Sequence, residues 1–212
     1  RAGRDQHRLP PEALRAPDDP QPLPDDRLGL GREAVARGAE TVLVSGPTGL
    51  VPPAGARTER VRTAAEMEKA CLEVFPKADI VVMAAAVSDF RFKETKGRKA
   101  AKDAIGTSLA VERTPDILAL LGRRKKPGQL LVGFAAETHD VLAHARKKLA
   151  AKNAGLMVAN AVGEGLGFGA DENAVRIIAR TGAVQETGTM SKREVSRVIF
   201  DRIEAELEKQ RR

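Results

Sequence analysis

The stretch that decides the fold is Asp79-Ile80-Val81-Val82-Met83-Ala84-Ala85-Ala86-Val87-Ser88-Asp89-Phe90-Arg91. Its first half is a short, continuous run of branched apolar residues, which is typical of a strand buried on both faces in a parallel sheet. Three alanines follow, and their small side chains let another molecule approach the backbone closely. Asp89 then places a carboxylate just beyond the carboxyl end of the strand, where open α/β sheets bind their ligands.

A basic segment follows this strand. It is poor in apolar residues and carries a series of cations, which are Arg91, Lys93, Lys96, Arg98, Lys99 and Lys102. We expect a loop here that closes over a polyanion. A sheet edge followed by a solvated basic linker explains these residues equally well, so the spacing alone leaves both interpretations open.

Strands and helices alternate from Arg32 to the end of the chain. Apolar runs predict strands at residues 40–45, 79–83, 108–112, 130–137 and 156–160, and an alternating run predicts a half-exposed strand at 173–179. Helix signals include capping boxes at Thr63 with Glu66 and at Ser191 with Glu194. This order predicts an α/β domain, Rossmann-like, with a mostly parallel sheet and helices on both faces.

Two further segments add candidate binding residues. In Thr114-Pro115-Asp116-Ile117-Leu118, Thr114 is expected to cap a helix, with Pro115 at its first position and Asp116 at the positive end of its dipole. Lys148 and Lys152 lie four residues apart and share one helix face, where a bound polyphosphate would offset their repulsion. A solvated basic face remains an equally good explanation of the two lysines.

Composition narrows the class of partner. The formal net charge of +7 favours anionic ligands, while the absence of Trp and Tyr argues against a stacking platform for nucleic acid. The single cysteine, Cys71, excludes an internal disulfide framework. No apolar run is long enough to cross a bilayer and no signal region opens the sequence, so we expect no membrane partner and a cytoplasmic location.

Residues 1–31 are rich in Pro, Asp and Arg, and we expect an aberrant, disordered N-terminal segment there.

The chain resembles the phosphopantothenoylcysteine synthetase family, the ligase half of the bifunctional coenzyme A biosynthesis protein. The resemblance covers residues 32–212, which we assign as the ligase domain. It rests on several short motifs in a fixed order, which are Ser45-Gly-Pro47, Ala85-Ala-Val-Ser-Asp-Phe-Arg91, Lys99-Ala-Ala-Lys102, Thr114-Pro-Asp-Ile-Leu118, Gly133-Phe-Ala-Ala-Glu-Thr138, Lys148 with Lys152, and Ala159-Asn160 followed by Gly167-Phe-Gly169 and Asn173.

The resemblance implies a ligase that joins 4′-phosphopantothenate to cysteine with CTP and Mg²⁺, through an acyl-cytidylate. It implies that Lys99 is catalytic and also binds the nucleotide. The other nucleotide-binding positions that it implies are Ala85, Ala86, Asp89, Pro115, Asp116, Ile117, Leu118, Phe134, Lys148 and Lys152. No metal-ligating residue is assigned. The resemblance also implies a homodimer, and a flavin-dependent decarboxylase domain that this chain does not contain.

The chain departs from the family pattern before the Ser-Gly-Pro strand. There the family has a first strand, a Gly-rich turn and an Asn-x-Ser-Ser-Gly motif, whose asparagine serves conversion of the acyl-cytidylate to product. None of these is present in residues 1–31. Ala161 also stands where the family usually has an acid. An alternative hypothesis is therefore a fragment that retains CTP binding but does not complete amide formation.

Overall fold

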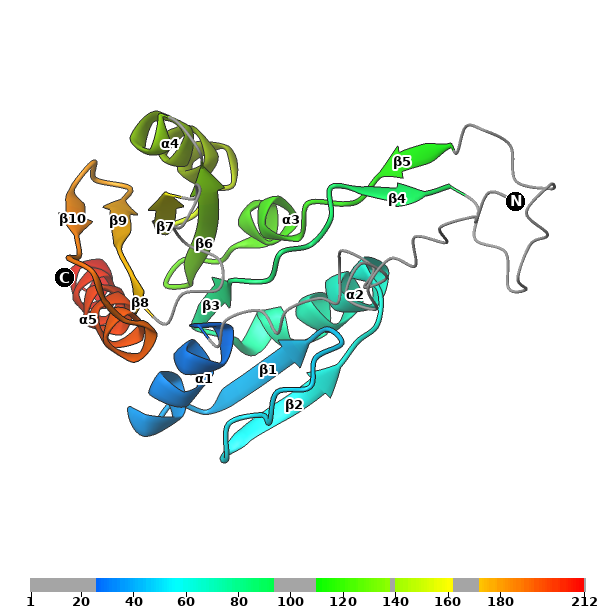
Figure 1. The fold of residues 1–212 in the computed structure, drawn as a ribbon, viewed down its shortest axis with the longest axis horizontal. Helices are drawn as coiled ribbons and strands as arrows, with labels where there is room; N and C mark the ends of the chain where they lie inside the picture. The colour runs from blue at the N-terminus through cyan, green and yellow to red at the C-terminus, as the bar shows by residue number, and fades with distance from the viewer. Residues whose placement is uncertain (1–25, 94–109, 138–139, 162–171, 212) are drawn as a thin grey trace, which may run out of the picture.

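A computed structural model describes residues 26–93, 110–137, 140–161 and 172–211 (Figure 1). The helices are α1 (Asp26–Ala36), α2 (Ala64–Val74), the 3-10 helix η2 (Phe75–Lys77), α3 (Ile117–Arg124), α4 (Val141–Ala151) and α5 (Lys192–Arg211). The strands are β1 (Thr41–Ser45), β2 (Ala56–Arg60), β3 (Ile80–Met83), β4 (Phe90–Phe92), β5 (Val111–Arg113), β6 (Leu130–Glu137), β7 (Leu156–Ala161), β8 (Glu172–Asn173), β9 (Val175–Ala179), β10 (Val184–Glu186) and β11 (Met190–Ser191).

The central sheet has five strands in the order β10-β9-β7-β6-β3. Its β3-β6-β7 half is parallel, as the apolar runs predict, while β7-β9 and β9-β10 pair antiparallel. A separate parallel pair, β1-β2, lies beside α1 and α2 (Figure 1). The predicted Rossmann-like α/β fold is confirmed. The sheet was expected to be mostly parallel, and its parallel strands β3, β6 and β7 are joined by two antiparallel strands that follow them in the sequence.

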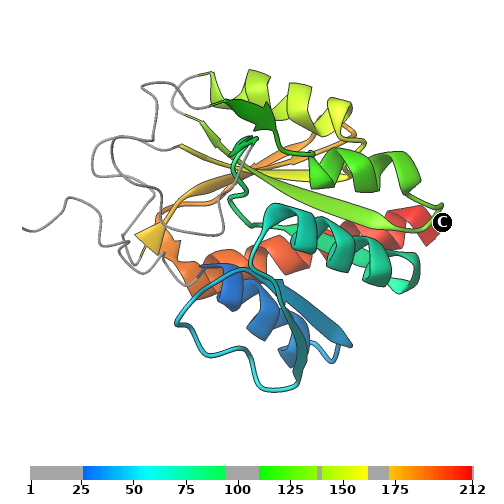
Figure 2. The same ribbon diagram turned by 90° about the vertical axis from the view of Figure 1, so that its right-hand side faces the viewer.

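Helices cover both faces of the central sheet, as Figure 2 shows from the side. One apolar cluster joins the sheet to α2, α3 and α4, and a second joins it to α1 and α5. Strand β6 alternates between them, since Leu131 and Ala135 belong to the first cluster and Leu130 and Val132 to the second. This period of two is the one expected for a strand buried on both faces.

Two strands differ from expectation in burial. Strand β9 was expected to be half exposed, yet Val175, Ile177 and Ile178 are buried because helices cover both of its faces. Strand β3 was expected to be buried on both faces, and its four residues are only half-buried. Its apolar side chains do reach both clusters, but one edge of the strand pairs with β6 and no described strand pairs with the other.

The N-terminal boundary also lies earlier than expected. Helix α1 begins at Asp26, inside the segment assigned as disordered to residue 31, and Leu28 and Leu30 on it are buried. Arg37 holds the end of this helix against α5 through ion pairs of 2.7 Å to Asp201 and 2.9 Å to Glu204. These contacts order residues 26–31 despite their weak helix pattern, whereas residues 1–25 lie outside the described part.

One predicted capping box forms completely and the other forms in part. Glu194 accepts from the Ser191 amide and donates its own amide to the Ser191 hydroxyl, which closes the N-terminus of α5. At α2 the Thr63 hydroxyl accepts from the Glu66 amide, while the Glu66 carboxylate accepts from Arg62 instead of from Thr63. Within the described residues, no helix is both long and apolar enough to span a membrane.

Helix α3 packs very closely on the residues that end α4. A Cβ atom added at Gly122 would lie 2.0 Å from the Lys152 carbonyl oxygen, a backbone atom that cannot rotate away. Asn153 fixes the same contact, because its side-chain amide donates to the Gly122 carbonyl at 2.8 Å. Glycine is therefore required at this position for reasons of space.

We predict that Gly122→Ala destabilises the domain by roughly 1–3 kcal/mol, because the added methyl group must push α3 away from Lys152. Urea unfolding followed by circular dichroism measures the change. Gly188→Ala is the matched control, since nothing lies within 4 Å of a Cβ atom at that position. Equal stability of the two variants would contradict the predicted clash.

Candidate functional site

The candidate site lies where β3, β6 and the N-terminus of α3 meet. Asp89 follows β3, and its carbonyl oxygen accepts a hydrogen bond of 2.9 Å from the Thr114 amide. This bond places the predicted acid next to the Thr114-Pro115-Asp116 segment, 25 residues later in the sequence. Asp89 and Ala86 are exposed and Ala85 is half-buried, so a ligand has access to this edge.

Asp116 caps α3, which corrects the predicted role of Thr114. The Asp116 carboxylate accepts from the Ala119 amide at 3.0 Å, and the helix begins at Ile117. Thr114 and Pro115 therefore both precede the helix. Asp116 takes the capping role because its carboxylate reaches the free amide of the first turn, which is the ordinary geometry of an N-cap.

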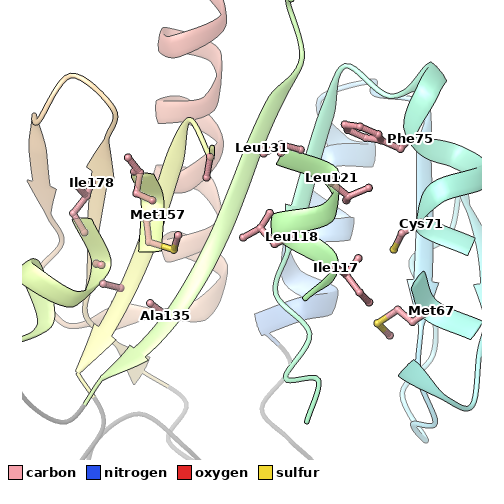
Figure 3. Packing of buried hydrophobic residues seen from close by; sticks show 14 of the residues in the cluster. Met67, Cys71, Phe75, Ile117, Leu118, Leu121, Leu131, Ala135, Met157 and Ile178 are labelled. Atoms are coloured by element: carbon pink, nitrogen blue, oxygen red, sulfur yellow. The ribbon is translucent and has the colours of Figure 1, made fainter. Parts of the chain in front are cut away.

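Ile117 and Leu118 are placed at the helix start, but their side chains belong to the core. Both are buried, and Figure 3 shows them beside Leu121, Leu131 and Met67. Only the backbone of these two residues is therefore available to a ligand. Unpaired amide groups at the start of a helix are suited to an anion.

Lys152, the C-cap residue of α4, lies close to this helix start. The Lys152 ammonium group is 3.3 Å from the Asp116 carboxylate, with the two side chains 26% and 49% exposed. Lys148 is half-buried one turn earlier, and with Lys152 it borders a shallow pocket of about 340 Å³. The structure thus brings Asp89, Asp116, Lys148 and Lys152 from three segments into one region.

Sequence reasoning missed His144, which lines the same shallow pocket one turn before Lys148. The spacing was visible in the sequence, because residues 144, 148 and 152 follow each other at intervals of four and therefore share a helix face. A single histidine on a basic helix gave no separate signal. His144 therefore adds a third nitrogen-containing side chain to the helix face that carries Lys148 and Lys152, which we call the lysine face.

Phe134 is placed on the other face of the sheet. It is half-buried and packs with the cluster of α1 and α5, whereas its neighbour Ala135 faces α3 and α4. Phe134 therefore does not contact the lysine face directly. A ligand that touches both must pass around the carboxyl end of β6.

The basic segment after β3 begins as a strand, where a loop was expected from Arg91 onward. Strands β4 and β5 form an antiparallel arm that projects from the body of the domain (Figure 1). Arg91 is paired with Glu112 at 2.7 Å, which neutralises its charge and holds the arm together. Lys99, the Glu137-Thr138 side chains and residues 163–169 lie outside the part whose side chains are described.

The fold and the site define a Rossmann-like α/β domain with cations and carboxylates gathered beside the carboxyl ends of the parallel strands of its mixed sheet. Residues 28–207 match the family described as DNA/pantothenate metabolism flavoprotein C-terminal domain, and the chain belongs to this family. A crystal structure of the C-terminal domain of coenzyme A biosynthesis bifunctional protein CoaBC is similar, with a TM-score of 0.73 and 38% identity over 86% of this chain and 82% of that one.

Similarity to curated proteins agrees with the structural match. The chain is 48% identical to the coenzyme A biosynthesis bifunctional protein CoaBC of Bacillus subtilis, over 83% of this chain and 44% of that protein. It is 40% identical to CoaBC of Mycobacterium tuberculosis, over 82% and 44% respectively. The chain thus spans less than half the length of these relatives. A Cab2 mutant in complex with phosphopantothenate-cysteine shares the fold alone, with a TM-score of 0.58 and 16% identity over 74% of this chain and 54% of that one.

We predict that Asp116→Ala destabilises the domain by about 1 kcal/mol, because it removes the cap of α3. Asp116→Asn should remain within about 0.5 kcal/mol of the parent, since an amide oxygen can still cap the helix and a partly exposed ion pair adds little. Thermal unfolding of both variants measures the difference. Equal losses in the two variants would mean that the ion pair to Lys152, and not the cap, stabilises this helix start.

Proposed function

We propose that the chain ligates 4′-phosphopantothenate to cysteine with CTP, through an acyl-cytidylate, in coenzyme A biosynthesis. The observation that carries the proposal is the 48% identity to a coenzyme A biosynthesis protein over 83% of this chain. The candidate site supports it, because the side chains at the sheet edge suit a nucleotide triphosphate. Lys148 and Lys152 would bind phosphate oxygens as point charges.

The charges of the site suit this ligand in a second way. Lys152 is paired with a half-exposed carboxylate at 3.3 Å, an interaction of modest strength that a phosphate can replace. The first amides of α3 lie beside the same carboxylate and would donate to a bound anion. Asp89 is exposed beside them and is assigned to the nucleotide by the resemblance.

Mg²⁺ would be held chiefly by the triphosphate. In the described part of the chain, no three His, Cys, Asp or Glu residues form a group that could bind a metal ion. Mg²⁺ commonly keeps several waters and binds one or two carboxylates together with substrate phosphates. The described residues fit that mode, and the ion would neutralise charge on the phosphate that is attacked.

The proposed chemistry has two steps. A carboxylate oxygen of 4′-phosphopantothenate attacks the α-phosphorus of CTP, and the bond to pyrophosphate breaks. The amine nitrogen of cysteine then attacks the acyl carbon, the bond to CMP breaks, and the amine loses a proton. Lys99 would stabilise the charge that develops in the first step, as a positively charged group can do when it closes over a reacting phosphate.

The homodimer implied by the resemblance is part of the proposal. The described residues offer an apolar surface for it on the β4-β5 arm, where Phe90, Phe92 and Val111 are 53%, 54% and 55% exposed. Large side chains gathered on a projecting arm are typical of a protein contact surface. A second copy of the chain would cover them.

Measurements of pyrophosphate release and amide formation test the ligase against a fragment that retains CTP binding and the first step but does not complete amide formation. With CTP, Mg²⁺ and 4′-phosphopantothenate, both predict pyrophosphate release. After cysteine is added, the ligase forms the amide and CMP, whereas the fragment forms neither. Absence of both activities, with no CTP binding by calorimetry, would contradict the proposed function itself.

We predict that Lys148→Ala and Lys152→Ala each weaken CTP binding roughly tenfold or more, because hydrogen bonds to charged groups contribute about 1.5–3 kcal/mol. Isothermal titration with CTP and Mg²⁺ measures the dissociation constants. Arg146→Ala is the control, since this exposed cation on α4 does not border the shallow pocket. A comparable loss in the control would indicate a general effect of charge.

We predict that Lys99→Ala slows acyl-cytidylate formation by about 100-fold or more, while CTP affinity stays within about twofold of the parent. A loss of this kind is expected when a group acts mainly on the transition state. Pyrophosphate release in the absence of cysteine gives the rate, and calorimetry gives the affinity. Lys93→Ala is the control. Equal losses of rate and affinity would contradict the catalytic role.

A further inference from the structure

Two cations lie together at the amino ends of β6 and β7, at the opposite end of these strands from the candidate site. Lys125 stands between α3 and β6, and Arg180 directly follows β9. Strand β9 runs antiparallel to β7, and its last residue, Ala179, pairs with Leu156 at the start of β7. Arg180 therefore lies beside that start, where its amide donates to the Gly155 carbonyl at 3.1 Å.

Asn153 holds both cations. Its main-chain carbonyl accepts from the Lys125 ammonium group at 3.4 Å, and its side-chain carbonyl oxygen accepts from the Arg180 guanidinium group. The same side chain donates to the Gly122 carbonyl at 2.8 Å, which fixes its orientation on α3. Two positive groups from distant parts of the sequence are thus bound to two oxygen atoms of one residue.

The backbone of Asn153 has a defined geometry as well. Its φ angle of 49° lies in the left-handed region, which asparagine adopts more readily than most residues. The Asn153 and Ala154 amides donate to the carbonyls of Ala150 at 3.2 Å and Leu149 at 3.1 Å, which is the pattern of a Schellman motif. The end of α4 therefore positions the residue that holds both cations.

The two positive charges have no carboxylate partner among the described residues. Burial and the charge of Arg180 lower the pKa of the Lys125 ammonium group, and no described carboxylate offsets these two effects. The negative end of the α3 dipole accounts for Arg123 and Arg124 in the last turn of that helix, but not for Arg180, which follows a strand. Lys125 is half-buried and Arg180 is exposed, so a ligand can reach them.

We propose that Lys125 and Arg180 bind the dianionic phosphate group of a small phosphate monoester, at a site separate from the nucleotide site. The guanidinium group has several N–H donors, so it can bind phosphate oxygens while it also donates to Asn153. A phosphate monoester carries a charge of about −1.5 to −2 at neutral pH, which matches two cations. A carboxylate or a phosphodiester carries one charge and would offset the repulsion only in part. The proposal does not depend on the proposed ligase activity.

Titration with inorganic phosphate tests the proposal on the full chain. Amide NMR spectra are recorded at about pH 8, where the phosphate is a dianion, and at constant ionic strength. The amide signals of Asn153, Gly155 and Arg180 should shift in a saturable way, with half of the change at about 1 mM phosphate or below. Shifts that do not saturate, that chloride reproduces, or that are confined to the lysine face of α4 would overturn the proposal.

Two variants and a matched control separate a specific site from general attraction to a basic chain. Lys125→Ala and Arg180→Ala should each weaken phosphate binding at least about tenfold. Arg124→Ala removes an exposed cation from the last turn of α3 and should change the affinity by less than about twofold. Circular dichroism checks that each variant is folded. Equal losses in all three variants would overturn the proposal.

A comparison of ligands on the parent chain remains decisive if a variant fails to fold. Glycerol 3-phosphate should shift the same amide signals as inorganic phosphate at a similar concentration. A short DNA duplex, whose phosphates are diesters, should shift them less at the same phosphate concentration. Stronger binding by the duplex would overturn the assignment to a phosphate monoester.

Discussion

The close approach of α3 to its neighbours is the constraint on which the candidate site depends. Two glycines permit it. A Cβ atom at Gly122 would overlap the Lys152 carbonyl oxygen, and one at Gly133 on β6 would lie 2.6 Å from Leu118. Because neither position carries a side chain, α3 lies close against both the sheet and the end of α4. This packing brings the Asp116 carboxylate within 3.3 Å of the Lys152 ammonium group, so core contacts determine the geometry of a surface site.

Alternation along β6 divides the candidate residues between two faces of the sheet. Ala135 faces α3 and α4, where the lysines lie, while Phe134 faces α1 and α5. A nucleotide that uses both must therefore lie across the carboxyl end of the strand, with its phosphates toward Lys148 and another part toward Phe134. That position is the one expected for ligands of open α/β sheets. It also explains why small residues follow the apolar runs of β3 and β6, since bulky side chains would block the edge.

The sequence could predict those parts of the fold that depend on local pattern. The apolar runs of β6 and β7, and the Ser191 and Glu194 pair, needed no information beyond neighbouring residues. Strands β2 and β4 were missed because charges interrupt them, and their stability comes from pairing with β1 and β5. The cap of α3 was placed at Thr114 because threonine and aspartate have similar capping preference. The position of the Ala119 amide, which is a property of the folded chain, determines that Asp116 and not Thr114 caps the helix. In the candidate site, the four-residue spacing of Lys148 and Lys152 could be predicted from the sequence. The proximity of Lys152 to Asp116, in contrast, depends on the glycine contacts of α3.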